Sequence, residues 1–207
     1  MSTVGKLSKR LLDVSVAASA LTLTTPLWLL GGVGTFLTLG RPVLFRQERA
    51  GLHGRAFSIF KFRTMRKPRP EDDPIAHDFE RLTPFGRWLR STSIDELPSL
   101  LNVLKGEMSL VGPRPLLLRY LERYSAEQAR RHEVPPGLTG WAQVRGRNRT
   151  TWEQRFTDDV WYVDHHTLAL DVWILVLTLW RVVQRSGVDA GPQTTMPEFM
   201  GTRANDQ

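Results

Sequence analysis

The stretch from Val14 to Gly40 reads VSVAASALTLTTPLWLLGGVGTFLTLG and contains no charged residue. Its 27 residues are long enough to cross the hydrocarbon core of a bilayer, about 30 Å thick, as one helix. Three interpretations compete: a cleaved signal peptide, a spanning helix, and a re-entrant hairpin that enters and leaves on one side. The signal peptide fits worst, because its apolar core is about 7–15 residues long and no Ala-x-Ala site follows here.

Pro26 divides this stretch into uncharged halves of 12 and 14 residues. Because proline removes a backbone donor, we expect a kink whose freed carbonyl, at Thr22, accepts a bond from the hydroxyl of Thr22, Thr24 or Thr25. Each half would reach only about 18–21 Å. Basic residues on both flanks favour two cytoplasmic ends: Lys6, Lys9, Arg10, Arg41, Arg46 and Arg49. Since kinked helices also span membranes, the residues alone leave the hairpin and the spanning helix open.

The composition is that of a folded chain of ordinary domain size, with 207 residues, 41% hydrophobic and 24% charged. It has no cysteine, which excludes disulfides, a thiol nucleophile and cysteine-ligated zinc or iron–sulfur sites, and its five histidines lack metal-binding spacing. The net charge of +7 indicates a polyanionic partner: nucleic acid, an anionic membrane face or phosphorylated substrates. Most of the cations are arginines, which suit phosphate but are equally expected of a genome rich in G and C.

After residue 40 the pattern changes to that of a small mixed domain. Alternating polarity predicts two strands, over residues 43–49 and 56–65, joined by a turn, and a further strand over residues 141–144. The charged and proline-rich residues 66–80 are typical of an exposed loop.

Leucines three and four positions apart over residues 97–104 predict a helix. Both Asp95 and Ser93 are suitable N-caps, and Gly106 is a suitable end. A second helical region over 116–133 is expected to break at Ser125, which begins a capping-box pattern. The apolar residues 168–184 fit either a core helix or an interfacial helix with tryptophans at headgroup depth.

Several residues carry the chemistry that the sequence offers. Asp95 and Glu96 would be kept ionised at a helix N-terminus, where a carboxylate suits a nucleophile or a ligand for a hard metal, although capping is the commoner role of such a pair. Arg114 lies between two prolines, which pre-organise its guanidinium for an anion. The remaining cations fit phosphate or, alternatively, solvated loops: Lys61 and Arg63 on one strand face, and Arg145 and Arg147 around Gly146.

Two carboxylates among fixed cations are the equipment for transferring a phosphoryl-type group, with Mg²⁺ held by Asp95 and Glu96 neutralising the charge. No P-loop is present, and Gly31-Gly32-Val33-Gly34 has the wrong spacing for a dinucleotide-binding loop.

The motifs of this chain resemble those of the bacterial sugar transferases, the monotopic polyprenyl-phosphate phosphoglycosyl transferases. The resemblance runs from Lys9 to about Gly201, and its tail is similar to that of the small, stand-alone PglC-like branch. The motifs that carry it are Lys9-Arg10-x-x-Asp13, Lys61-Phe62-Arg63-Thr64-Met65, Ser93-Ile94-Asp95-Glu96-Leu97-Pro98, the residues 102–115 (NVLKGEMSLVGPRP) and the residues 136–143 (PGLTGWAQ).

The resemblance implies transfer of a sugar 1-phosphate from a UDP-sugar to undecaprenyl phosphate, with release of UMP. It implies a covalent phosphosugar ester on Asp95, and a Glu96 that supports Mg²⁺ and the incoming lipid phosphate. Lys61, Arg90, Arg114 and Arg147 match basic family positions. The family's helix break is a Ser-Pro pair, whereas this chain has Thr25-Pro26, which keeps the hydroxyl; the resemblance favours the hairpin.

We therefore predict an α+β fold with a kinked re-entrant membrane helix (residues 1–40), a cytoplasmic-face catalytic domain (41–190) and a tail (191–207). The catalytic domain would combine several helices, some interfacial, with a short antiparallel sheet. The expected location is the bacterial inner membrane, with its lipids as partners and no nucleic acid; a homodimer is left open, as is the sugar. A membrane-anchored basic scaffold that binds anionic lipid or nucleic acid without catalysis is the alternative function.

Overall fold

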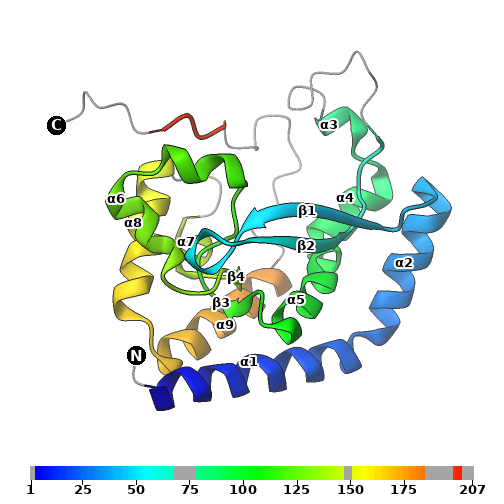
Figure 1. The fold of residues 1–207 in the computed structure, drawn as a ribbon. Coiled ribbons are helices and arrows are strands. Elements are labelled where there is room, and N and C mark those ends of the chain that lie inside the picture. The colour runs from blue at the N-terminus through cyan, green and yellow to red at the C-terminus, as the bar shows by residue number, and fades with distance from the viewer. Residues whose placement is uncertain (1–2, 68–77, 147–150, 185–197, 202–207) are drawn as a thin grey trace.

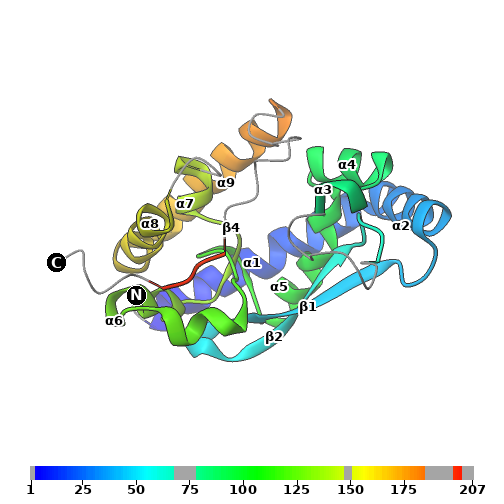
Figure 2. The same ribbon diagram turned by 90° about the horizontal axis from the view of Figure 1, so that it is seen from above.

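The computed structural model describes residues 3–67, 78–146, 151–184 and 198–201. Helix α1 (Thr3–Leu23) runs beneath a mixed domain and α2 (Thr25–Leu39) turns up along its side (Figure 1). Figure 2 shows the same arrangement from above, with α1 behind the domain and α2 at one end. The predicted α+β class is confirmed. The other elements, in chain order, are β1 (Leu44–Ala50), η1 (Leu52–Gly54), β2 (Ala56–Phe62), α3 (Asp78–Arg81), α4 (Pro84–Ser91), η2 (Ile94–Ser99), α5 (Leu100–Lys105), β3 (Ser109–Val111), η3 (Leu118–Arg123), α6 (Ala126–Ala129), η4 (Arg130–His132), β4 (Gly137–Thr139), α7 (Trp141–Arg145), α8 (Trp152–His165) and α9 (Leu168–Val183).

The uncharged N-terminal stretch is broken where the sequence predicts. Helices α1 and α2 meet at a bend of 65°, and Pro26 lies in the first turn of α2. The hydroxyl of Thr25 donates to the freed carbonyl of Thr22 at 2.9 Å. Among the described residues no single helix is both long and apolar enough to cross a membrane, whereas this bent pair meets that criterion as a unit. The kink at Pro26 is thus confirmed.

Two small sheets build the centre of the domain. The predicted hairpin is confirmed: β1 and β2 pair antiparallel, from Leu44 opposite Phe62 to Ala50 opposite Ala56. Strands β3 and β4 pair in parallel, which the sequence analysis did not predict. The main core packs around β3, α5, α8 and α9, and it includes Val103, Leu110 and Tyr162.

Two local predictions about residues 141–144 and Asp95 are wrong. Residues 141–144 begin helix α7 rather than a strand, because the strand that pairs with β3 lies just upstream, at Gly137–Thr139. A short apolar run fits either structure equally well. Asp95 is not an N-cap but lies inside the first turn of the 3₁₀ helix η2, where Ser93 takes the cap position with a φ of 57° and no side-chain bond.

Other helix ends agree with the sequence. Gly106 ends α5 with a φ of 85°, the left-handed conformation that glycine adopts without strain. Ser125 and Gln128 form the complete capping box of α6, which interrupts the helical region as predicted. The predicted loop over residues 66–80 falls largely outside the described residues.

Helix α1 is fastened to the domain by buried polar groups. Lys9 forms an ion pair with Asp171 of α9 at 2.7 Å, and Asp13 accepts a bond from the backbone N–H of Leu110 at 3.0 Å. Arg10 donates to the carbonyls of Val103 and Leu104 at 2.6 and 2.8 Å, at the end of α5. The N-terminal helix is therefore part of the folded domain.

Helix α9 combines the two alternatives that its sequence leaves open. Ile174 is fully buried in the core, whereas Trp173 and Trp180 are more than half exposed. Their exposed neighbours on the helix are also apolar: Val172, Val176 and Leu179. One face of α9 thus belongs to the core, and the other presents tryptophan and aliphatic side chains outward.

We expect the packing of α2 to depend on Gly34. A Cβ there would lie 2.1 Å from the ring of Phe85 in α4, whereas a Cβ at Gly32 would meet only Phe62, at 3.9 Å. Gly34→Ala should therefore lower the free energy of unfolding by about 1–3 kcal/mol through overpacking. Gly32→Ala, the matched control, should leave it nearly unchanged. Thermal unfolding of the purified protein in detergent measures both, and equal effects would contradict this packing.

Candidate active site

The carboxylate pair lies where η2, β2 and the Pro113–Pro115 loop converge. Asp95 and Glu96 sit in η2, which packs closely against β2. Ser99 and Asn102 hold the edge of β2: the hydroxyl of Ser99 donates to the carbonyl of Phe60 at 2.7 Å, and the amide of Asn102 bonds Ser58 and Phe60. These bonds fix the strand that carries Lys61 beside the pair.

Glu96 joins the two predicted cations Lys61 and Arg114. Its Oε1 accepts bonds from Lys61 Nζ at 2.6 Å and from Arg114 Nη2 at 3.0 Å. Burial acts to raise the pKa of Glu96, but the two cations outweigh it and hold that pKa well below its usual range. Glu96 therefore stays ionised and links β2, η2 and the Pro113–Pro115 loop.

Asp95 has the opposite environment. Its side chain is buried, and nothing in the described part of the chain donates a hydrogen bond to its carboxylate. Burial, and after it the charge of Glu96, raises the pKa of Asp95 to about 6, against the opposing charges of Lys61, Arg90 and Arg114. A carboxylate short of donors is a less solvated and more reactive nucleophile than one that is fully hydrogen-bonded.

The other predicted cations have different partners. Arg90 lies close enough to Asp95 to lower its pKa, and its guanidinium donates to Thr64 Oγ1 and Met65 Sδ, both at 3.0 Å. Arg145 pairs with Asp158 at 3.1 Å. Arg147 lies outside the described residues.

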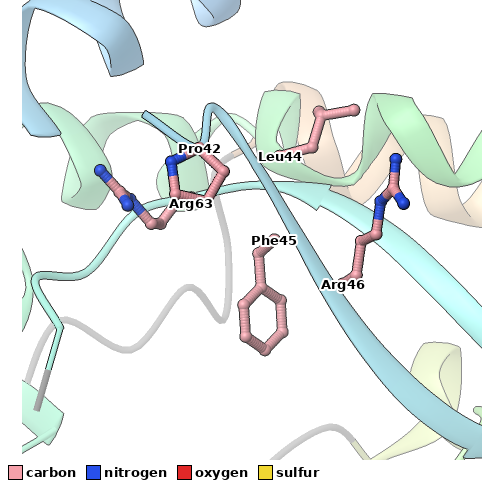
Figure 3. Close-up of a pocket in the computed structure, with 5 residues that line it drawn as sticks. All are labelled: Pro42, Leu44, Phe45, Arg46 and Arg63. Carbon is pink, nitrogen blue, oxygen red and sulfur yellow. The ribbon is translucent and has the colours of Figure 1, made fainter. Parts of the chain in front are cut away.

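Arg63 does not join Lys61 at the carboxylate pair. Strand β2 ends at Phe62, so the alternation that would place both cations on one face ends there too. The guanidinium of Arg63 instead donates to the carbonyls of Leu39, Gly40 and Arg41, at the end of α2. It lines an open hollow of about 480 Å³ with Pro42, Leu44, Phe45 and Arg46, where Figure 3 shows the two guanidinium groups on opposite sides of the view.

A smaller cavity, of about 70 Å³, lies beside Glu96. Lys61, Glu96 and Arg114 line it, together with Arg49, which the sequence analysis noted only as a flanking charge. The sequence could have indicated Arg49, because the register of the predicted hairpin places its side chain on the same face as that of Lys61. The site thus contains one cation more than the motifs predicted.

Comparison with known proteins identifies the family. A family model described as "Bacterial sugar transferase" matches residues 4–185. The chain belongs to the bacterial sugar transferase family.

Relatives of this transferase differ in length. It is 49% identical over 194 residues to the "Uncharacterized sugar transferase EpsL" of Bacillus subtilis, covering 94% of this chain and 96% of that protein. It is 45% identical over 183 residues to the "UDP-glucose:undecaprenyl-phosphate glucose-1-phosphate transferase" of Caulobacter vibrioides, covering 84% and 68%. It is 42% identical over 165 residues to the "Undecaprenyl-phosphate galactose phosphotransferase" of Salmonella typhimurium, covering 72% and 35%.

The raised pKa of Asp95 gives this transferase a testable pH dependence. Because the folded-state pKa lies above the unfolded value, the native state binds the proton more tightly, and this group's contribution to stability grows as the pH falls from about 7 to 4. Relative to Asp95→Asn, the wild-type protein should gain about 1–3 kcal/mol of unfolding free energy between pH 7.5 and pH 4. Denaturant unfolding in EDTA measures the difference, which also cancels the contributions of other titrating groups; a loss instead of a gain would contradict the buried, donor-poor setting of Asp95.

Proposed function

We propose that this protein transfers a sugar 1-phosphate from a UDP-sugar to undecaprenyl phosphate, through a covalent intermediate on Asp95. Curated relatives whose names specify UDP-glucose and undecaprenyl phosphate support the two substrates. The observation that carries the mechanism is a buried Asp95, short of hydrogen-bond donors, beside a Glu96 held by two cations. The identity of the sugar is left to a panel of donors.

The reaction is a double displacement at one phosphorus atom. An oxygen of the Asp95 carboxylate bonds to the phosphorus that carries the sugar, and the bond from that phosphorus to UMP breaks, so UMP leaves with the electron pair. An oxygen of undecaprenyl phosphate then bonds to the same phosphorus, and Asp95 leaves as a free carboxylate. The product is undecaprenyl-diphosphate-sugar.

The side chains around Asp95 have distinct parts in this reaction. Lys61 and Arg114 keep donors beyond those given to Glu96, and these would hold phosphate oxygens and stabilise the charge that develops on them. Arg90, near Asp95 and fixed by Thr64 and Met65, would favour the ionised nucleophile. The largely buried position of Asp95 would limit the access of water to the phosphosugar ester.

The residues present also fit Mg²⁺. The described residues contain no cluster of three metal-binding acids or histidines, but Mg²⁺ commonly takes one or two carboxylates and completes its shell with water and substrate phosphates. Asp95 accepts no bond in the described chain, and Glu96 uses only Oε1, which leaves carboxylate oxygens on both residues for a cation. The ion would neutralise phosphate charge.

The lipid acceptor calls for a site at a membrane surface. The bent pair α1–α2 exposes apolar residues along both helices, and α9 exposes Trp173 and Trp180, which are typical of a membrane–water interface. We propose that the bent pair enters one leaflet from the cytoplasmic face of the bacterial inner membrane and returns to it.

The central test of this function uses Asp95→Asn. Wild-type protein given a panel of UDP-sugars, undecaprenyl phosphate and Mg²⁺ should release UMP with one or more of them, and EDTA should stop it. With the donor alone, intact-protein mass spectrometry should detect wild-type protein heavier by one sugar phosphate. Asp95→Asn should lose both signals by at least about 10³-fold, because the amide cannot act as the nucleophile.

Asp164→Asn is the matched control, since Asp164 is an exposed aspartate that pairs only with Arg130 among the described residues. It should keep near-normal turnover. UMP release by Asp95→Asn at the wild-type rate would rule out the covalent mechanism. A folded wild-type protein that releases no UMP from any donor but binds anionic vesicles would favour the basic scaffold.

The membrane topology has its own test, because the chain has no cysteine of its own. Single cysteines at Val4 and Arg55, both exposed, report on the two sides of the bent pair. In intact spheroplasts a membrane-impermeant maleimide should label neither, and after lysis it should label both. Labelling of Val4→Cys alone in intact spheroplasts would mean that the helix pair spans the membrane.

A further inference from the structure

Arg49 lies on the same face of the β-hairpin as the active-site residue Lys61. In the β1–β2 register Arg49 is opposite Phe57 and Phe45 is opposite Lys61. Residues directly opposite each other share a face, and so do residues two apart along one strand. Arg49 and Lys61 therefore project from different strands toward one side of the hairpin, where both line the small cavity beside Glu96.

This cavity carries more positive than negative charge. Its charged lining consists of Arg49, Lys61 and Arg114 against the single carboxylate of Glu96, which already pairs with the other two cations. Arg49 forms no ion pair in the described chain. Its guanidinium donates to the amide oxygen of Gln47, at 2.5 Å.

The position is electrostatically unfavourable for a free cation. Burial lowers the pKa of Arg49 to about 10, and the nearby positive charge of Arg114 contributes in the same direction. A half-buried cation without a counter-ion costs stability unless something else compensates it. An anion in the cavity would supply that compensation.

We propose that Arg49 binds a phosphate group of one of the two substrates, together with Lys61 and Arg114. A cavity of about 70 Å³ suits a phosphate group rather than a whole nucleotide. The planar guanidinium offers two parallel donors to phosphate oxygens, and the partly buried site strengthens such bonds. This inference rests on the proposed function, since the donor and the acceptor supply the phosphate.

The test begins with binding, which does not require turnover. Inorganic pyrophosphate should bind the wild-type protein, as measured by calorimetry, and Arg49→Met should weaken that binding by about 10- to 100-fold, the value of one or two charge-assisted hydrogen bonds. Arg49→Lys keeps the positive charge but loses the planar guanidinium with its two parallel donors, so it should recover part of the lost pyrophosphate affinity. Arg46→Met is the matched control, because Arg46 is an exposed arginine of the same strand on its other face.

Kinetic measurements then identify which substrate supplies the phosphate. If Arg49→Met slows adduct formation from the UDP-sugar alone, the group belongs to the donor. If the adduct forms normally and its transfer to undecaprenyl phosphate slows, the group belongs to the acceptor. Wild-type protein that binds pyrophosphate but turns over no donor would overturn the proposed function while leaving the anion site intact.

Thermal unfolding separates a binding role from a structural one. Because it removes an uncompensated cation, Arg49→Met should have an unchanged or higher melting temperature than the wild-type protein. The increase in melting temperature on adding substrate should be smaller in Arg49→Met than in the wild-type protein. A lower melting temperature with unchanged pyrophosphate binding would mean that Arg49 is structural. Pyrophosphate binding and both reaction steps within twofold of wild type, or equal losses in Arg46→Met, would overturn the proposal.

Discussion

The buried ion pair between Lys9 and Asp171 joins helices α1 and α9 beside the candidate active site. Lys9 Nζ also donates to the carbonyl of Val111. The hydroxyl of Tyr162 donates to Asp171 at 2.6 Å and lies 3.1 Å from the Val111 carbonyl, so that α1, α8, α9 and β3 share one polar cluster inside the core. Truncating one member of such a pair leaves the other charge buried and uncompensated, which typically costs about 3–5 kcal/mol. Because Val111 is followed by the loop that carries Arg114, the cluster holds the N-terminal helix in fixed relation to the cation that binds Glu96.

The two adjacent carboxylates of the site have different pKa values because their surroundings differ. Glu96 accepts hydrogen bonds from Lys61 and Arg114 on one oxygen and remains ionised, whereas burial, and after it the charge of Glu96, raises the pKa of Asp95 to about 6. Two carboxylates whose environments separate their pKa values in this way are commonly divided between structural and reactive roles. The arrangement costs folding stability, because Asp95 and Arg49 carry charges that the described protein does not pair. Asp95 and Arg49 both lie where substrate phosphates and a divalent cation would offset these stability costs.

Sequence patterns predicted the features that depend on local chemistry. Pro26, Gly106 and the capping box at Ser125 each act through their own backbone or a bond three or four residues away, and the structure places each as expected. The patterns failed where contacts with segments distant in the sequence determine the local structure. Residues 141–144 are helical because β3 pairs with the segment just before them, and Asp95 enters the first turn of η2 rather than capping it. Arg49 was not singled out because no motif contains it: its place beside Lys61 follows from the register of the hairpin, which requires knowing that the strands pair.

The three consecutive residues Lys61, Phe62 and Arg63 explain how the candidate site is held at a fixed position relative to helix α2. Lys61 points toward Glu96, and Phe62, on the other face of the strand, packs edge-on against Trp28 and under Gly31 of α2. Beyond the strand end, Arg63 donates to the last carbonyls of α2, which compensates both the unpaired acceptors and the partial negative charge of a helix C-terminus. One short segment thus contacts Glu96, the side of α2 and the end of α2. Under the proposed function, a rigid connection of this kind would hold Asp95 at one depth, where it would meet the phosphate of a donor free in water and that of an acceptor confined to the bilayer.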